Sequence, residues 1–322
     1  MKKCKVGILG GAGYTGGELI RLLINHPFVE IGYIHSNSNA GNFVYEVHTD
    51  LLGDTDLKFV NATDESVDVV FLCLGHGESI KRVDSISKKV KVIDLSQDFR
   101  LNSEQSRPFV YGLPELNKEQ IKKAHNVANP GCFATAIQLA LLPLASENKL
   151  PKGIQINATT GSTGVGQRLS SSSHFTWRQN NASVYKPFEH QHLAEINKSL
   201  TFLQASFSAD MLFIPQRGTF TRGIMACVTL TTSLSIEALK NTYAAYYRDH
   251  PFVHVSDKAI DLKQVVNTNK CVLYIEKYKE QLLIVSVIDN LLKGASGQAV
   301  QNMNLMFGFD EKAGLQLKAS AF

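Results

Sequence analysis

Short apolar runs separated by glycine-rich and polar stretches organise the first half of the chain. Runs of this kind predict buried strands of a parallel sheet, and they fall at 5–10, 29–34, 67–74 and 90–95. After the first run, an amphipathic pattern over 18–25 predicts a helix. Strands that alternate with helices predict an α/β fold with a Rossmann-like first domain.

The second half of the chain has a different pattern. Alternating apolar and polar residues predict strands of a mixed or antiparallel sheet, and they occur at 154–160, 226–232, 272–274 and 282–288. The segment 148–153 interrupts the pattern and is the predicted domain boundary. We therefore expect a Rossmann-like domain over 1–149, completed by a C-terminal helix over 297–322, and an α+β domain over 150–296.

Composition narrows the class of protein. With 322 residues, 44% of them hydrophobic and 19% charged, the chain is long enough for two globular domains. The net charge of +4 is small, and the lysines and arginines are scattered along the chain. A solvated surface explains them better than a nucleic-acid-binding face does. The five cysteines form no CxxC pair, so neither disulfides nor a zinc site are expected. No apolar run reaches the roughly 18 residues of a membrane span, and the sequence predicts a soluble, cytoplasmic protein.

A glycine-rich loop joins the first strand to the first helix. Glycines at such a turn let the backbone approach a pyrophosphate, and the helix N-terminus directs its amides at the same group. Glycine turns also occur for packing alone, but the order strand, glycines, helix favours dinucleotide binding. The predicted contacts in this loop are Gly10, Gly13, Tyr14, Thr15 and Gly16.

The loop after the second strand indicates which nucleotide binds. An NAD enzyme usually carries an acidic residue there to hold the ribose hydroxyls, but residues 35–41 contain only small hydroxyl, amide and imidazole groups. Ser36 and Ser38 are therefore predicted to accept a 2′-phosphate, which favours NADP(H), and the alternative is a plain polar loop. Further cofactor contacts are predicted at Gly75, Asn290, Gly294 and Gln298.

Cys132 is the candidate nucleophile. It follows the turn Asn129-Pro130-Gly131 and precedes an apolar helical run over 134–142. A thiol at a helix N-terminus gains thiolate character, because unpaired amides and the helix dipole stabilise an anion. An isolated cysteine is more often a buried structural residue, but the turn and the helix start favour the reactive interpretation.

His190 and His192 form the second group with chemical potential. Two histidines two residues apart suit metal ligands on a strand, but no third ligand has suitable spacing, so no metal site is predicted. One imidazole paired with Cys132 as a general acid and base fits better. Glu195 lies three residues after His192, within reach of its ring on a helix.

Two arginines and a serine-rich stretch complete the candidate residues. Arg100 follows a strand, where it would bind a phosphate or carboxylate, and a surface ion pair is the alternative. Arg217 lies beside Gly218 and is a second candidate anion contact. The stretch 161–173 has the composition of a flexible linker, but its place between strands also suits a substrate loop.

Together these motifs resemble one family. They are the glycine loop 7–16, Asp94-Leu95-Ser96 with Asp98-Phe99-Arg100, Tyr111-Gly112-Leu113-Pro114-Glu115, Asn129-Pro130-Gly131-Cys132, His190-Gln191-His192 and the run 293–304. The set resembles N-acetyl-gamma-glutamyl-phosphate reductases, which are similar in fold to aspartate-semialdehyde dehydrogenases. The resemblance implies the NADPH-dependent reduction of an acyl phosphate to a semialdehyde in arginine biosynthesis. It also implies a homo-oligomer, a dimer or tetramer assembled through the sheet of the second domain.

The resemblance also implies roles for individual residues. Cys132 would attack the acyl phosphate, expel phosphate and form a thioester, with His192 as the first choice for the acid and base. The loop with Ser162, Gly164 and Arg168 would line the substrate pocket, as would Tyr185.

The chain departs from the family pattern at two positions. Gln191 replaces the arginine of a His-Arg-His motif, and Asn37 stands where relatives often carry an arginine for the 2′-phosphate. The N-acyl group, acetyl or a larger acyl such as succinyl, stays open. The alternatives are an aspartate-semialdehyde dehydrogenase and a non-catalytic NADP(H)-sensing protein.

Overall fold

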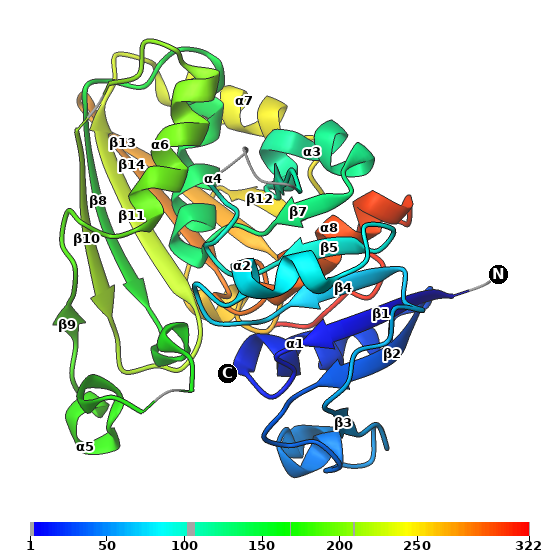
Figure 1. Cartoon of the computed structure of the whole chain (residues 1–322). Helices are drawn as coiled ribbons and strands as arrows, with labels where there is room; N and C mark the ends of the chain where they lie inside the picture. The colour runs from blue at the N-terminus through cyan, green and yellow to red at the C-terminus, as the bar shows by residue number, and fades with distance from the viewer. Residues whose placement is uncertain (1–2, 102–106, 168, 209, 322) are drawn as a thin grey trace. The chain divides into compact units, whose positions relative to one another are not determined.

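The chain forms two compact units. A computed structural model describes residues 3–101, 107–167, 169–208 and 210–321. Met1–Gly131 and Ala295–Gln316 make up the first unit, and Cys132–Gly294 with Leu317–Phe322 make up the second. Each unit contains one seven-stranded sheet with helices packed around it (Figure 1).

The sheet of the first unit is parallel throughout, with strand order β3-β2-β1-β4-β5-β7-β6. Its strands are β1 (Cys4–Leu9), β2 (Val29–His35), β3 (Phe59–Val60), β4 (Val69–Leu72), β5 (Lys91–Asp94), β6 (Val110–Tyr111) and β7 (Asn126–Ala128). Its helices are α1 (Tyr14–Leu23), α2 (Ser79–Arg82), α3 (Pro114–Lys123) and α8 (Ser296–Phe307). The predicted Rossmann-like architecture is confirmed. Helix α1 begins at Tyr14, earlier than the predicted Glu18, because the last glycines of the loop already form its first turn.

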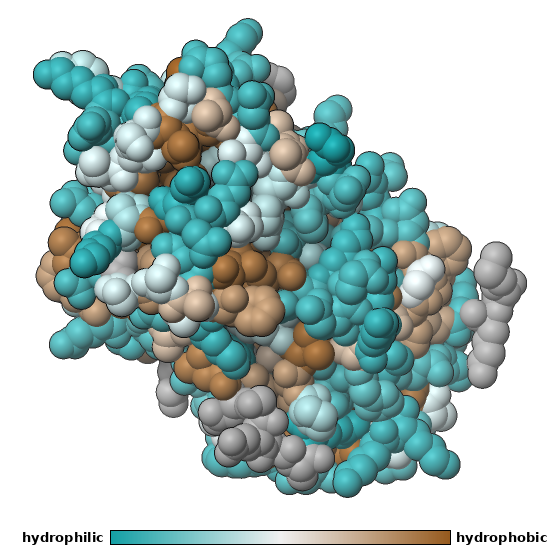
Figure 2. Space-filling model, turned by 90° about the horizontal axis from the view of Figure 1, so that it is seen from above, coloured by the Kyte–Doolittle hydropathy of each residue, from teal (hydrophilic) through white to brown (hydrophobic). Residues whose placement is uncertain are grey.

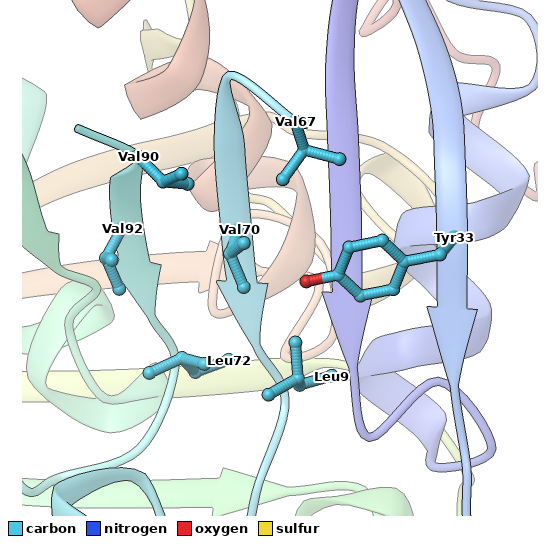
Figure 3. Packing of buried hydrophobic residues seen from close by; sticks show 7 residues of the cluster. All are labelled: Leu9, Tyr33, Val67, Val70, Leu72, Val90 and Val92. Atoms are coloured by element: carbon cyan, nitrogen blue, oxygen red, sulfur yellow. The ribbon is translucent and has the colours of Figure 1, made fainter. Parts of the chain in front are cut away.

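A hydrophobic cluster fills one face of this sheet. Figure 3 shows the Tyr33 ring lying from β2 across β1 toward the valines and Leu72 of the neighbouring strands. The ring occupies the space beside Gly7, where an added Cβ would lie 2.3 Å from the Tyr33 ring. Gly7 therefore makes room for a core side chain, although its spacing suggests a part of the nucleotide loop.

Helix α8 returns to the first unit through buried amides. The Asn302 amide donates to the Gly112 carbonyl at 2.8 Å, and Asn304 lies 3.0 Å from His26 Nε2. These contacts help a polar helix to pack inside a domain, since the buried Asn302 and Asn304 side chains each have a hydrogen-bonding partner. The helix expected over 297–322 ends at Phe307, because Gly308 takes a left-handed φ of 68° that closes the C-terminus.

The sheet of the second unit is mixed, with strand order β12-β13-β14-β11-β8-β10-β9. A mixed or an antiparallel sheet was predicted. Pairs β8–β10 and β12–β13 are parallel and the other four pairs are antiparallel. The strands are β8 (Gly153–Thr160), β9 (Ser183–Val184), β10 (Asp210–Arg217), β11 (Ile224–Thr231), β12 (Val253–Ser256), β13 (Cys271–Tyr278) and β14 (Gln281–Ile288). The helices are α4 (Cys132–Ser146), α5 (Phe175–Arg178), α6 (His192–Leu203) and α7 (Ile236–Tyr247).

The division between the units falls before α4 and not at the boundary expected near residue 150. Helix α4 is almost entirely buried, and it packs against α6, α7, β11 and β14 of the second unit. Tyr243 on α7 donates its hydroxyl proton to the Ala140 carbonyl of α4, which ties the two helices together. The apolar helix after Cys132 is thus the core of the second unit.

The face shown in Figure 2 carries mainly hydrophilic residues, with separate hydrophobic patches between them. Among the residues that the structure describes, no helix is both long and apolar enough to cross a bilayer.

Candidate active site

The glycine loop after β1 has the geometry of a nucleotide-binding turn. Gly10 takes a φ of +81°, and a Cβ added there would lie 2.3 Å from the Cys73 carbonyl oxygen. The loop continues into α1, whose N-cap residue, Gly13, offers no side-chain hydrogen bond to the first amides of the helix. These amides are thus available to an anion.

Thr15 and Tyr14 lie in the first turn of α1. The Thr15 side chain is hydrogen-bonded to the Cys73 thiol, whose pKa burial raises to about 12, so this thiol stays neutral. Ser296, at the start of α8, donates its hydroxyl proton to the Thr15 carbonyl at 2.9 Å. The phenol ring of Tyr14 is partly exposed beside this turn. The structure therefore brings the start of α8, and Gln298 with it, to the predicted cofactor loop.

The loop after β2 carries the two serines of the predicted 2′-phosphate site, with Ser36 buried and Ser38 exposed. The Asn39 amide donates to Ser36 Oγ at 3.2 Å and to Ser38 Oγ at 3.1 Å. Each hydroxyl group accepts that bond and keeps its own proton to donate. Gly75 follows β4 at the same sheet edge, and an added Cβ there would meet no atom within 4 Å, so packing does not require this glycine.

Arg100 is buried and bonded to the backbone. Its Nε donates to the Asn129 carbonyl at 2.9 Å and its terminal nitrogen donates to the Leu95 carbonyl at 3.0 Å. These bonds hold the segment that leads to Cys132. Beside them, burial raises the pKa of Asp94 to about 6, against the hydrogen bonds of Ser79 and Ser96. The anion-binding role of Arg100 stays a prediction, and its visible role is to fix this loop.

Cys132 is the first residue of α4, which confirms the predicted position at a helix N-terminus. It is half-buried, and none of the five cysteines, all within the described residues, forms a disulfide. An added Cβ on Gly294 would lie 2.8 Å from the Cys132 Cβ, so a larger residue at 294 would displace the nucleophile. The Tyr185 ring centroid lies 5.8 Å from that of His190, and the charge of Cys132 contributes, after burial, to raising the pKa of Tyr185.

Phe133, the next residue, brings both histidines to the start of α4. Its ring centroid lies 5.5 Å from that of His190 and 6.3 Å from that of His192, and the two imidazoles are 4.5 Å apart. Both imidazoles are buried. The cysteine and the two histidines therefore belong to one cluster within the second unit.

The two histidines differ in their electrostatic surroundings. The His192 amide donates to His190 Nδ1 at 3.2 Å, so the proton of a neutral His190 is on Nε2. Burial, and secondly the charge of Lys186, lower the pKa of His190 to about 4, so this ring is neutral near pH 7. His192 Nε2 instead lies 4.0 Å from a Glu195 carboxylate oxygen, at the helical spacing that the sequence predicted.

Four of the predicted substrate residues, those that belong to the second unit, lie near one end of its sheet. Strands β8 and β10 are parallel with Thr160 opposite Arg217, so Ser162 and Gly164 follow β8 at the end where Arg217 closes β10. The Arg217 guanidinium stacks over the Tyr185 ring at 4.6 Å, and its Nε is buried with no hydrogen-bond partner among the described residues. The candidate Arg168 lies outside the described residues.

Asn290 and Gly294 belong to the second unit, unlike the other predicted cofactor residues. The Asn290 side chain accepts from the Gly223 amide at 2.7 Å and donates to Thr163 Oγ1 at 3.0 Å. It therefore orders the loop after β8, and its cofactor contact stays a prediction.

Sequence reasoning missed two features of this site. The buried Asp289 carboxylate pairs with Arg222 at 3.0 Å and accepts from the Leu291 and Leu292 amides, which fixes the turn that ends at Gly294. Lys186 was also missed, although its place four residues before His190 was a visible signal. Among the described residues, no group of three or more metal-binding side chains gathers anywhere.

Comparisons with known proteins define the class to which this fold and site belong. Residues 5–124 match the family model "Semialdehyde dehydrogenase, NAD binding domain", and residues 132–290 match "Semialdehyde dehydrogenase, dimerisation domain". The first unit is therefore a nicotinamide-dinucleotide-binding domain of the semialdehyde dehydrogenase class. An aspartate semialdehyde dehydrogenase II from Vibrio cholerae shares the fold, with a TM-score of 0.75 at 16% identity over 96% of this chain and 99% of that one.

Relatives with higher identity identify the family more closely. The N-acetyl-gamma-glutamyl-phosphate reductase of Phocaeicola vulgatus is 56% identical over 321 residues, and that of Azobacteroides pseudotrichonymphae is 58% identical; each match covers 99% of both chains. The chain belongs to the N-acetyl-gamma-glutamyl-phosphate reductase family.

Gly10→Ala tests the nucleotide loop. Because Gly10 has a left-handed φ and a backbone oxygen at 2.3 Å from the new Cβ, we expect a loss of about 2 kcal/mol or more in the free energy of unfolding. Nucleotide affinity should fall at least about tenfold with it. Denaturant unfolding and a nucleotide titration measure the two effects.

Gly13→Ala is the matched control for stability. Its φ is −80° and the nearest atom to an added Cβ is 3.7 Å away, so the free energy of unfolding should fall only by about 1 kcal/mol, the cost of alanine at an N-cap. Equal destabilisation by both variants would contradict the geometric reason given for Gly10.

Proposed function

We propose that the protein reduces an N-acyl-gamma-glutamyl phosphate to the N-acyl-glutamate 5-semialdehyde, with release of phosphate, in arginine biosynthesis. The observation that carries this proposal is the cluster of Cys132, Tyr185 and the two histidines at the start of α4. The relatives named N-acetyl-gamma-glutamyl-phosphate reductase, whose matches cover 99% of both chains, support this proposal.

Cys132 begins the reaction as a thiolate. The sulfur attacks the acyl carbon, the carbon–oxygen bond to phosphate breaks, and inorganic phosphate leaves a thioester on the enzyme. The α4 N-terminus favours the anionic sulfur before attack and after release of the product. When bound at the glycine loop and the start of α1, a nicotinamide nucleotide would supply the hydride for reduction of this thioester.

His192 is the general acid and base of the second half-reaction, the reduction of the thioester. It gives a proton to the thioester oxygen as hydride adds to the carbon, and takes it back as the carbon–sulfur bond breaks and the aldehyde forms. Glu195 supports the charged form of the ring from 4.0 Å. His190 is neutral, with its proton on Nε2, and donates a hydrogen bond to the same oxygen.

We infer NADP(H) as the cofactor from the loop after β2. Ser36 and Ser38 offer hydroxyl donors, and no carboxylate lies in residues 35–41 to oppose a 2′-phosphate. The remaining first-unit contacts are those predicted at the glycine loop, Gly75 and Gln298. Titration with NADPH and NADH in parallel tests the preference, and tighter binding of NADH would contradict it.

We also propose a cytoplasmic homo-oligomer, a dimer or tetramer that assembles through the second unit. The match of residues 132–290 to a dimerisation domain supports this, as do the exposed Val184 and Leu212 side chains on β9 and β10. The molar mass in solution, measured by light scattering, tests the proposal, and a monomer would contradict it.

The decisive activity experiment runs the reaction backward. Phosphate-dependent formation of NADPH is followed with N-acetyl-glutamate semialdehyde, its N-succinyl analogue and aspartate semialdehyde. Turnover with an N-acylated aldehyde is the expected result, and the better substrate identifies the acyl group. Activity with aspartate semialdehyde alone would overturn the proposal in favour of the neighbouring enzyme class.

A further inference from the structure

Lys186 lies beside Gln191, the position at which the chain departs from a His-Arg-His pattern. Its Nζ donates to Gln191 Oε1 at 3.4 Å, and both side chains are exposed within the second unit. Gln191 lies between His190 and His192 in the chain, and the charge of Lys186 contributes, after burial, to lowering the pKa of His190. Lys186 therefore supplies a positive charge where residue 191 has none.

The backbone holds Lys186 in this place under strain. Lys186 has a φ of 44° and Phe188 a φ of 65°, both in the left-handed region that side chains other than glycine disfavour. The Tyr185 amide donates to the Pro215 carbonyl at 3.1 Å, and the Phe188 amide donates to the Phe213 carbonyl at 2.8 Å. Strand β10 thus fixes the segment on both sides of Lys186.

No carboxylate of the described residues forms an ion pair with Lys186. Glu195 lies instead at His192. The other cation of the cluster, Arg217, is half-buried and stacks on Tyr185 near the thiol. An uncompensated ammonium, directed by strained backbone at a catalytic cluster, is suited to an anionic ligand.

We propose that Lys186 binds a carboxylate of the substrate and replaces the positive charge that Gln191 does not provide. This inference rests on the proposed function, since it assumes an N-acyl-glutamyl substrate. A carboxylate is favoured over the phosphate because the phosphate is bonded to the reacting carbon at Cys132, where Arg217 and Tyr185 lie. In an N-acyl-gamma-glutamyl phosphate, three carbon atoms separate the α-carboxylate from the reacting carbon, so a cation other than Arg217 is needed to bind it.

Lys186→Met tests the inference in the reverse reaction, where aldehyde and phosphate are separate substrates. We expect the KM for the aldehyde to rise about tenfold or more, with kcat and the KM for phosphate changed less than about threefold. The Lys186→Met/Gln191→Arg double variant should recover most of the lost affinity, because residue 191 already reaches within 3.4 Å of the ammonium. A purely structural role of Lys186 would show no such recovery.

Lys279→Met is the matched control. Lys279 also has a left-handed φ, of 54°, and lies in the turn between β13 and β14. Ile288, the last residue of β14, lies at the other end of these two strands. Its variant should keep the wild-type KM for aldehyde and phosphate. Comparison of N-acetyl- and N-succinyl-glutamate semialdehyde identifies the carboxylate: an equal rise in KM points to the α-carboxylate, and a rise for the succinyl compound alone points to the acyl group.

An unchanged KM for the aldehyde, or a rise in the KM for phosphate in its place, would overturn the inference. A rise that the double variant does not reverse would also overturn it. These failures differ from failure of the proposed function, because in the latter case the wild-type protein itself would not turn over either N-acylated aldehyde.

Discussion

Cys132→Ser is expected to lower turnover by about 10⁴-fold or more while nucleotide binding stays intact. The reaction needs an anionic nucleophile that also leaves easily, and a serine hydroxyl stays protonated at neutral pH. Its oxygen ester would also resist the hydride step more than a thioester does. The substitution changes one atom at the start of α4, so the free energy of unfolding should change by less than about 1 kcal/mol.

The test combines the rate of phosphate-dependent NADPH formation with a direct NADPH titration. Cys227→Ser is the matched control, because Cys227 is a half-buried cysteine of the same unit, on β11, outside the histidine cluster. It should keep turnover within about twofold of wild type. A Cys132→Ser protein with near-normal turnover would remove the thioester from the mechanism.

Local signals account for the parts of the fold that the sequence predicted. The apolar runs, the glycine loop and the Pro-Gly turn before Cys132 each concern residues close together in the chain, and their strands and helices formed within a few residues of the predicted bounds. The domain boundary was misplaced because the partners of α4 are β11, β14, α6 and α7, which are distant in sequence. A gap in the hydrophobic pattern cannot show which sheet an apolar helix covers.

The candidate site shows the same difference between local signals and contacts that depend on the tertiary structure. The contact between His192 and Glu195 was predictable, since it depends only on the spacing of a helix. The neutral state of His190 was not, because it depends on the His192 amide, on burial and on a lysine held in left-handed backbone by β10. Gly7 adds a contact of the second kind, since an added Cβ there would meet the ring of Tyr33 on the neighbouring strand, which the spacing of glycines does not reveal.

His192→Gln is expected to cause the second-largest loss, about 10²- to 10⁴-fold in turnover, as for a lost general acid and base. The pH profile separates its role from that of its neighbour. His190 has a pKa of about 4, below the ordinary value, so it stays uncharged as the pH rises from about 5 to 9 and contributes no change in rate there. Any change in rate between about pH 5 and pH 9 should therefore persist in His190→Gln.

His190→Gln is the matched variant because a glutamine amide retains both a donor and an acceptor. It can accept from the His192 amide, as Nδ1 does at 3.2 Å, and still donate to the substrate oxygen, so the loss should stay below about tenfold. The measurement is the rate as a function of pH for wild type and both variants. If His190→Gln flattened the profile and His192→Gln preserved it, His190 would be the general acid and base and His192 the hydrogen-bond donor. The hydrogen bond from the His192 amide would then position a titrating base.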